Sequence, residues 1–290
     1  MFTGAMVALI TPFQDGEIDF HTLEELIEFQ LNSGIDAIVP VGTTGESPTL
    51  SHDEHKQLIE QIVKIVDGQV PVIAGAGSNS TAEAIELTAF AKRVGADATL
   101  QVTPYYNKPT QEGFYQHFKA IAEEVDLPIV LYNIPGRCGA GMTPDTIARL
   151  AEVENIVAIK EATGSLDQAS EIALQCDITI ISGDDSLTLP LASVGGKGVI
   201  SVAANIVPAD VKAMTDLILE GDFASARQWH KKLFALCKNM LTLATNPIPI
   251  KAAMAMLNMA PEELRLPMTP LEESKKAVLR QTLRNYGLLE

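Results

Sequence analysis

The fold is decided by the stretch Asn155-Ile156-Val157-Ala158-Ile159-Lys160-Glu161-Ala162-Thr163-Gly164-Ser165. Its apolar run, residues 156–159, is mostly β-branched and has no polar alternation, which predicts a strand buried on both faces, as in a parallel sheet. Gly164 and Ser165 then supply a turn and an N-cap, which predicts that a helix follows. The stretch is therefore a strand-helix unit that places Lys160 at the end of the strand.

Lys160 is the residue that we expect to carry the chemistry. Burial disfavours the charged form of an amine, and a neutral lysine attacks a carbonyl carbon to form a Schiff base. The alternative is a solvated lysine that pairs with a neighbouring carboxylate such as Glu161. The residues at the ends of the other strands, at the same edge of the sheet, decide between a reactive and a solvated lysine.

Seven further runs resemble the one before Lys160 and bring the number of predicted strands to eight. The eight runs are Ala5–Ile10, Ala37–Val41, Val70–Ala74, Ala98–Val102, Pro128–Tyr132, Ile156–Lys160, Ile178–Ser182 and Gly198–Val202. Between them, apolar residues recur at helical spacing, as in Leu23, Leu26, Ile27 and Leu31. Alternating strands and helices predict an α/β fold with a parallel sheet, and eight such units can close a (β/α)₈ TIM barrel. An open doubly wound sheet is the alternative, although no G-x-G-x-x-G follows the first run.

Two helix-to-strand junctions nearly repeat, as Gly34-Ile35-Asp36-Ala37 and Gly95-Ala96-Asp97-Ala98. Each glycine suits the position just after a helix end. The similarity extends no further, so we interpret it as an echo of one strand-helix period and not as a duplicated domain.

The chain after the eighth run contains no convincing strand. Pro208–Leu219 is predicted to be the last barrel helix, and helical patterns then cover Phe223–Leu243, Ile248–Leu257 and Ser274–Tyr286, interrupted by prolines. We expect a catalytic barrel over residues 1–220 and a C-terminal helical extension over residues 221–290. Oligomerisation and covering of the barrel mouth are both open roles for this extension.

Composition limits the classes of function. The 290 residues are 47% hydrophobic and 20% charged, as in a globular protein. A formal charge of -16 repels phosphate backbones and anionic membrane surfaces, so we expect neither nucleic-acid nor membrane binding. No apolar run reaches membrane-spanning length, and the first residues lack a basic signal-peptide region, which favours a cytoplasmic protein. Three cysteines at unrelated spacings fit neither a disulfide framework nor a metal site.

In a barrel the active site forms at the carboxyl ends of the strands. The predicted strands deliver four groups there: Gly42-Thr43-Thr44-Gly45-Glu46, Thr103-Pro104-Tyr105-Tyr106-Asn107, Tyr132-Asn133-Ile134-Pro135-Gly136-Arg137, and Lys160. Backbone amides and hydroxyls of the first turn suit a carboxylate, although an ordinary turn would have the same residues. Tyr132 is either a general acid/base or a packed aromatic, and Arg137 either a bidentate carboxylate ligand or a solvated loop residue.

Ser182-Gly183-Asp184-Asp185 follows the seventh run. Paired aspartates suggest a metal site or a helix N-cap. We favour the cap, because no histidine or third carboxylate joins them at a recognisable metal spacing.

These motifs, in this order and spacing, resemble the 4-hydroxy-tetrahydrodipicolinate synthase (dihydrodipicolinate synthase) family of the pyruvate-dependent aldolase and N-acetylneuraminate lyase superfamily. The resemblance covers nearly the whole chain, from Gly4 and Ala8 to Asn246-Pro247-Ile248-Pro249-Ile250-Lys251. It implies a lyase of lysine and diaminopimelate biosynthesis that condenses pyruvate with L-aspartate 4-semialdehyde. The imine itself is the electron sink, so the resemblance implies no metal and no organic cofactor.

The resemblance also implies roles for the catalytic residues. Lys160 matches the lysine that condenses with pyruvate, and Tyr132 matches the tyrosine that moves protons during Schiff-base formation. Thr43 and Tyr106 match the two residues that relay those protons. The family commonly assembles as a homotetramer built from dimers, in which Tyr106 would reach the site of a neighbouring subunit.

Substrate-binding positions follow from the same resemblance. Thr44 matches the residue that holds the pyruvate carboxylate, and Arg137 the one that receives the carboxylate of the semialdehyde. Gly183 and Ile200 match positions that line the site through backbone groups. Cys138 replaces a threonine that is usual in the family, which puts one local hydrogen bond in doubt.

Two other functions compete with this one. A sugar-acid lyase of the N-acetylneuraminate or 2-keto-3-deoxy acid type would use the same lysine on a longer substrate, but Arg137 and the Tyr105-Tyr106 pair favour a short carboxylated aldehyde. A non-catalytic barrel that binds a small acid, as a sensor or scaffold, is the second competitor. The joint presence of Lys160, Tyr132, Thr43 and Tyr106 argues against it.

A second polar cluster surrounds the second and third strand-helix units and comprises Ser47, Pro48, His52, His55, Asn79, Glu83 and Tyr105. His52 and His55 are three residues apart at a helix start and share a face, and Glu83 offers a carboxylate to an ammonium group. A solvated helix start without ligand is the alternative. In feedback-sensitive members of the resembled family, matching positions bind L-lysine, which implies allosteric inhibition by that amino acid. Pro48 stands where alanine is frequent.

Overall fold

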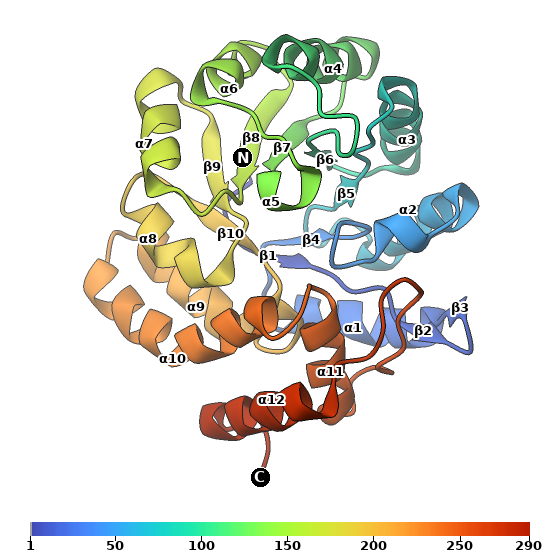
Figure 1. The fold of residues 1–290 in the computed structure, drawn as a ribbon, viewed down its shortest axis with the longest axis vertical. Coiled ribbons are helices and arrows are strands. Elements are labelled where there is room, and N and C mark those ends of the chain that lie inside the picture. The colour runs from blue at the N-terminus through green and yellow to red at the C-terminus, as the bar shows by residue number, and fades with distance from the viewer. Residues whose placement is uncertain (1) are drawn as a thin grey trace.

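The computed structural model describes residues 2–290 and contains a barrel of parallel strands (Figure 1). Within these residues one sheet has eight strands in the neighbour order β4-β1-β10-β9-β8-β7-β6-β5. Their bounds are β1 Gly4–Ala8, β4 Ala37–Val39, β5 Ile73–Gly75, β6 Ala98–Val102, β7 Ile129–Asn133, β8 Ile156–Glu161, β9 Thr179–Ser182 and β10 Gly198–Ser201. A parallel bridge between Ile38 and Val72 joins the two ends of this order and nearly closes the barrel. A short antiparallel hairpin follows β1 and consists of β2 (Phe13–Gln14) and β3 (Glu17–Ile18).

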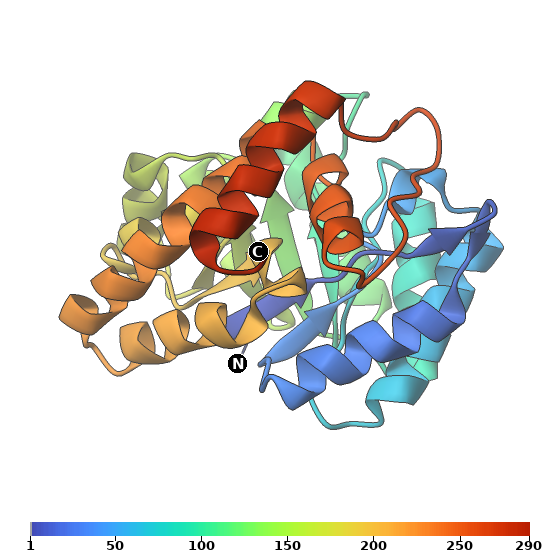
Figure 2. The ribbon, with the colours of Figure 1, turned by 90° about the horizontal axis from the view of Figure 1, so that it is seen from below.

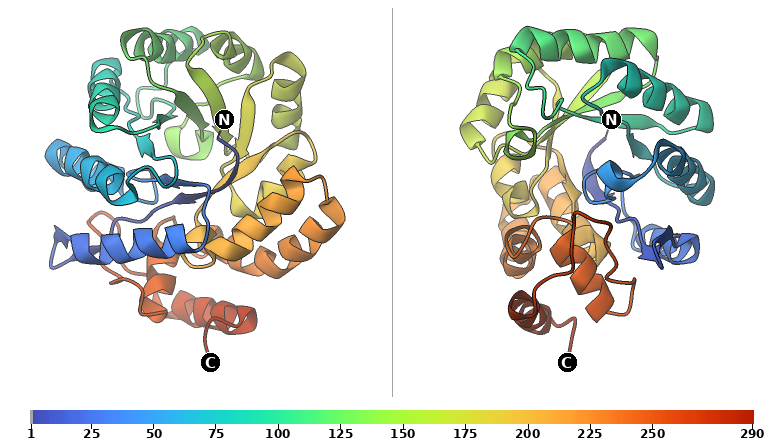
Figure 3. Two further views of the ribbon diagram at one scale, coloured as in Figure 1. Left: turned by 180° about the vertical axis from the view of Figure 1, so that it is seen from behind. Right: turned by 45° about the vertical axis from the view of Figure 1, so that its right-hand side comes forward.

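Helices cover the outside of the barrel (Figure 3). Around the strands lie α1 Phe20–Asn32, α2 His52–Val66, α3 Thr81–Val94, α4 Gln111–Glu124, α6 Pro144–Ala151, α7 Leu166–Gln175, α8 Thr188–Ala192 and α9 Pro208–Leu219. The short helix α5 Pro135–Cys138 lies inside this ring, in front of the strands in Figure 1. Single 3₁₀ turns occur at η1 Ser47–Thr49, η2 Asp185–Leu187 and η3 Ala203–Asn205. The predicted N-cap at Ser165 is present, since this residue accepts a hydrogen bond from the Gln168 amide. Ser51 also caps α2, where it forms a capping box with Glu54. None of the helices within residues 2–290 combines the length and apolar character needed to cross a membrane.

The predicted (β/α)₈ barrel is confirmed, and each of the eight predicted runs overlaps one of its strands. Three strand bounds differ from the prediction at prolines, and one of them is the start of β7, which begins at Ile129 and not at Pro128. β4 ends at Val39 because Pro40 has no amide to donate and Val41 adopts a φ of 55°. β5 begins at Ile73, because Pro71 likewise lacks an amide.

The near-identical helix-to-strand junctions share a structural role at the amino ends of the strands. The Asp36 carboxylate accepts a hydrogen bond of 2.8 Å from the Ala5 amide, and the Asp97 carboxylate accepts one of 2.8 Å from the Val72 amide. Each aspartate therefore joins the start of its own strand to the neighbouring strand.

Three helices follow the barrel: α10 Phe223–Thr242, α11 Ile248–Met256 and α12 Glu273–Tyr286. α10 packs along α9, and α12 packs on α10 and α11 (Figure 2). Buried residues of all three, such as Leu236, Ile250 and Leu283, belong to the same apolar cluster as Val7 and Leu23 of the barrel. The C-terminal helices therefore share a core with β1 and α1.

Candidate active site

Lys160 lies inside the barrel, beside Tyr132. The two residues are paired in register on β8 and β7, and the Lys160 Nζ is 4.3 Å from the centroid of the Tyr132 ring. Both side chains are buried, with 6% of Lys160 and 5% of Tyr132 exposed. Gly183 follows β9 and leaves room for the lysine, since a Cβ there would lie 3.2 Å from the Lys160 Cε.

The Lys160 environment favours a neutral amine. Burial lowers the pKa of Lys160 to about 8 from its ordinary 10.5, while the Asp185 carboxylate acts in the opposite direction and the Arg137 charge in the same one. The alternative partner, Glu161, points away along the alternation of the strand and accepts a hydrogen bond of 2.8 Å from the Thr163 amide. At about pH 8 half of the lysine is therefore available as a nucleophile.

Tyr132 and Thr43 meet at the carboxyl end of the barrel. Both line a small cavity of about 40 Å³. Burial raises the pKa of Tyr132 to about 12, against the opposing effects of the Arg137 charge and of a hydrogen bond with Thr43. The tyrosine thus holds its proton at neutral pH, with the Thr43 hydroxyl as its hydrogen-bond partner.

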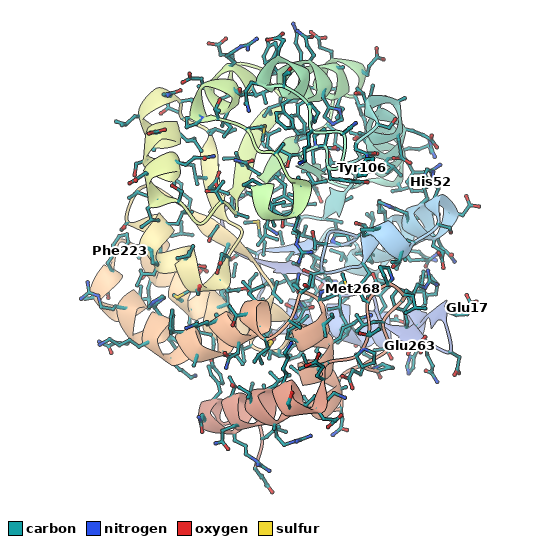
Figure 4. The ribbon with its side chains drawn as sticks, viewed as in Figure 1. Glu17, His52, Tyr106, Phe223, Glu263 and Met268 are labelled. Carbon is teal, nitrogen blue, oxygen red and sulfur yellow. The ribbon has the colours of Figure 1, made fainter. Side chains whose placement is uncertain are left out.

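Tyr106 does not join Tyr132 and Thr43 within the same chain. Its side chain is 90% exposed, and its backbone adopts a φ of 71° that turns the residue outward. Figure 4 shows it at the rim of the barrel, on the side where His52 lies. Its hydroxyl is therefore free to contact another molecule.

The Gly-Thr-Thr-Gly-Glu turn begins from a strained backbone. Val41 is β-branched but has a φ of 55°, in the left-handed region that such residues rarely adopt. Its carbonyl lies so close to Gly75 that any Cβ at that position would clash with it. Glycine at position 75 thus permits the conformation from which the chain enters the turn.

A buried ion pair anchors the other end of this turn. The Glu46 carboxylate lies 2.5 Å from the Lys251 Nζ, and the side chains are only 2% and 0% exposed. The Arg265 amide donates to the second Glu46 oxygen at 3.1 Å, and the Lys251 Nζ also donates to the Glu263 carbonyl at 2.8 Å. The C-terminal region therefore holds the turn, a contact that sequence reasoning did not predict.

Asn246 connects the turn to Arg137. The Asn246 Nδ2 donates to the Thr44 Oγ1 at 3.0 Å, and the Arg137 Nη2 donates to the Asn246 carbonyl at 3.0 Å. Thr44 and Asn246 are both buried. The two predicted carboxylate-binding residues, Thr44 and Arg137, are thus brought together through one residue of the C-terminal region.

Ile200 is the remaining predicted site residue, and the structure also describes Cys138 and Asp184, which the sequence analysis considered. Ile200 is buried on β10 in the same inner cluster as Tyr132. Cys138 is buried beside Thr103, whose hydroxyl partly offsets the rise that burial causes in the pKa of the thiol. Asp184 caps η2 by accepting from the Ser186 amide at 2.9 Å, which confirms the predicted cap.

A larger cavity of about 450 Å³ extends from the turn toward the second polar cluster. Its walls include Thr43, Arg137 and Asn246 together with Ser47, Pro48, His52, His55, Glu83 and Tyr105. Pro267 and Met268 of the C-terminal region also line it. Thr43 and Arg137 of the candidate active site therefore line the same cavity as most of the second polar cluster.

Within the second cluster Glu83 is the central charge. Its carboxylate lies 2.6 Å from the His52 Nε2 and also accepts a hydrogen bond from Ser78. His55 is buried with its Nε2 2.7 Å from the Gly75 carbonyl, and burial lowers its pKa. His55 thus contacts the same glycine as the strained Val41.

Tyr105 and Asn79 complete the second cluster. The Asn79 Nδ2 donates to the Tyr105 carbonyl at 3.1 Å, which fixes the loop that carries Tyr105 and Tyr106. Burial, and then the Glu83 charge, raises the pKa of Tyr105. Asn79 supports the loop and is not among the residues that line the cavity.

Known proteins match the chain over its whole length. The model of the dihydrodipicolinate synthetase family matches residues 1–286. The 4-hydroxy-tetrahydrodipicolinate synthase of Geotalea uraniireducens is 54% identical over 291 residues, with 100% of both chains covered. The dihydrodipicolinate synthase of Acinetobacter baumannii, solved in complex with pyruvate, is 45% identical with a TM-score of 0.97 and full coverage of both chains. That of Cyanidioschyzon merolae, solved with lysine bound, is 44% identical with a TM-score of 0.95 and 99% of both chains covered.

Proposed function

The chain belongs to the dihydrodipicolinate synthetase family and is a lyase, and on this basis we propose that it condenses pyruvate with L-aspartate 4-semialdehyde to give 4-hydroxy-tetrahydrodipicolinate. The observation that carries the proposal is the buried Lys160 amine, with its pKa lowered to about 8, against the ring of Tyr132. Such an amine is nucleophilic near neutral pH.

The chemistry follows from these positions. The neutral Lys160 attacks the ketone carbon of pyruvate, and loss of water gives an imine. Removal of a methyl proton gives an enamine whose carbon adds to the aldehyde carbon of the second substrate. The amino group of that substrate then attacks the imine carbon, closes the ring and releases Lys160. Tyr132 and Thr43 carry protons in these steps.

The two carboxylates of the substrates are assigned to separate residues. Thr44, in the turn held by Glu46, receives the carboxylate of pyruvate. Arg137 receives the carboxylate of the semialdehyde through its planar guanidinium group. Gly183 and Ile200 bound the lysine side of the site through their backbones.

Trapping of the imine tests this function directly. Incubation with pyruvate and borohydride, followed by peptide mass spectrometry, is expected to place a reduced pyruvyl group on Lys160. Lys251 is a matched internal control, because it is also a buried lysine but pairs with Glu46. An unmodified Lys160 in active protein refutes the mechanism, and cleavage of sialic acid without condensation of the semialdehyde moves the enzyme to the sugar-acid lyases.

We also propose that the enzyme is inhibited by L-lysine at the second polar cluster. Glu83 offers a carboxylate to an ammonium group, and the cluster shares a cavity with Thr43 and Arg137. A relative that is 44% identical has been solved with lysine bound. Binding at the two sites would then be coupled reciprocally.

Turnover with and without millimolar L-lysine tests this regulation in the wild type and in Glu83→Ala. The wild type is expected to lose activity and the variant to resist. Glu86→Ala is a matched control on the same helix, because its carboxylate pairs with Lys56 on the surface. Full wild-type activity at saturating lysine ends the idea, whereas equal inhibition of the wild type and Glu83→Ala moves the site elsewhere.

We further propose a homotetramer in which the exposed Tyr106 completes the proton relay of a neighbouring subunit. The 90% exposure of this side chain supports the assignment. Sedimentation measurements across a dilution series, with activity recorded in parallel, test it. A fully active dilute monomer contradicts it.

A further inference from the structure

Asn246 makes an unusual set of contacts at the edge of the active-site cavity. Its backbone carbonyl accepts from Arg137, so this contact requires no particular side chain at position 246. The side chain itself makes one hydrogen bond, from Nδ2 to the Thr44 Oγ1 at 3.0 Å. Its Oδ1 is buried and has no partner within residues 2–290.

The side chain of Asn246 contributes to the site through its donor. The Nδ2 group makes the one hydrogen bond that this side chain forms within residues 2–290. An asparagine at this position therefore supplies Thr44 with an amide N–H that alanine lacks.

The donor determines what the Thr44 hydroxyl can do. A hydroxyl has one hydrogen to donate and two lone pairs to accept with. Because the Asn246 amide donates to the Thr44 oxygen, the hydrogen of Thr44 is not used in this contact and is free for an acceptor in the site. Donation to an oxygen also polarises its O–H bond and strengthens the next hydrogen bond in the chain.

We infer that Asn246 is a positioning residue that orients and polarises the Thr44 hydroxyl toward the carboxylate of pyruvate. The inference rests on the proposed role of Thr44 and adds a residue from the C-terminal region to the pyruvate subsite. Asn246 acts through Thr44 and does not touch the reacting atoms. The Arg137 contact uses only the main chain and is retained in an alanine variant.

A double-mutant cycle tests the inference. Asn246→Ala, Thr44→Val and the double variant are compared with the wild type by the pyruvate concentration that gives half-maximal borohydride trapping of Lys160. This readout requires pyruvate alone. Asn246→Ala is expected to raise that concentration about tenfold, in line with the loss of a hydrogen bond that supports a charged group. In the Thr44→Val background the same change is expected to have less than a twofold effect.

A split between kinetic constants separates positioning from general damage. With Asn246→Ala, kcat at saturating pyruvate and the KM for the semialdehyde are expected to stay within twofold of the wild type. Asn246→Asp is a near-isosteric second variant whose carboxylate can only accept a hydrogen bond from the Thr44 hydroxyl. It is therefore expected to weaken the binding of pyruvate more than Asn246→Ala does. An equal loss in all constants, or effects that simply add in the double variant, overturns the inference.

Failure of the inference is distinguishable from failure of the proposed function. If Thr44→Val raises the half-maximal pyruvate concentration but Asn246→Ala does not, only the inference is wrong. If Thr44→Val leaves it unchanged, the carboxylate assignment to Thr44 is wrong, and the inference with it. If pyruvate cannot be trapped on Lys160 of the wild type, the mechanism itself is refuted.

Discussion

Replacing Lys251 with methionine is expected to destabilise the protein and to disturb the turn that contains Thr43 and Thr44. In the folded protein Lys251 is 0% exposed and Glu46 2% exposed, so the substitution leaves a carboxylate buried without its counter-ion. Breaking such a pair costs about 3–5 kcal/mol. Because the Arg265 amide still donates to Glu46, we expect a loss in the free energy of unfolding at the lower end of this range, about 3 kcal/mol.

Calorimetry at pH 7 measures this effect as a change in Tm. For a chain of this size about 3 kcal/mol corresponds to a decrease of roughly 6–12 °C. Lys92→Met is a matched control, because the Lys92 Nζ lies 3.8 Å from an Asp126 carboxylate that is 98% exposed, and a pair of this kind contributes at most about 1 kcal/mol. The double variant Glu46→Gln/Lys251→Met is expected to recover most of the loss, because no unpaired charge remains. A Tm for Lys251→Met equal to that of Lys92→Met refutes the reasoning.

Three further predictions concern catalysis. Because the Lys160 amine must be neutral and its pKa is about 8, the rate of pyruvate trapping is expected to rise with pH, to reach half of its maximum at about pH 8 and to level off only at higher pH. Asp185→Asn removes a charge that raises this pKa and is expected to move the midpoint to lower pH, and an unchanged midpoint contradicts the assignment. Tyr132→Phe is expected to keep the Tm and to lower kcat about 100-fold in a steady-state assay, and normal turnover removes Tyr132 from the mechanism. Tyr106→Phe is expected to lower kcat by a similar factor. Mixed oligomers of Tyr106→Phe and Tyr132→Phe are expected to regain part of the activity, because one site then has both hydroxyls. If the mixtures are no more active than their components, the Tyr106 hydroxyl does not come from a neighbouring subunit.

The barrel was predictable because its signals are local. Each strand is a short apolar run, and adjacent runs of a parallel sheet bring their carboxyl ends to one place. The contact between Lys160 and Tyr132 follows from that arrangement, since their strands are neighbours in both sequence and space. The role that we propose for each residue comes from the resemblance to a known family.

The contacts that shape the site were not predictable in the same way. Glu46 and Lys251 are 205 residues apart, and nothing around either one indicates that its charge is buried. The spacing of His52 and His55 predicted a shared helix face but not the contact of His55 with the Gly75 carbonyl. The left-handed conformation of Val41 was also missed, because a β-branched residue gives no local signal for it.

The Glu46–Lys251 pair has a consequence for the order of events during synthesis. Glu46 emerges from the ribosome 205 residues before its partner, and at about 5–20 residues per second the delay is roughly 10–40 s. During that interval the barrel strands can form, but the carboxylate that anchors the turn has no counter-ion and stays in water. The growing chain therefore contains Lys160 well before it can fix the turn that carries Thr43 and Thr44, and the complete candidate site forms only after α11 has been made.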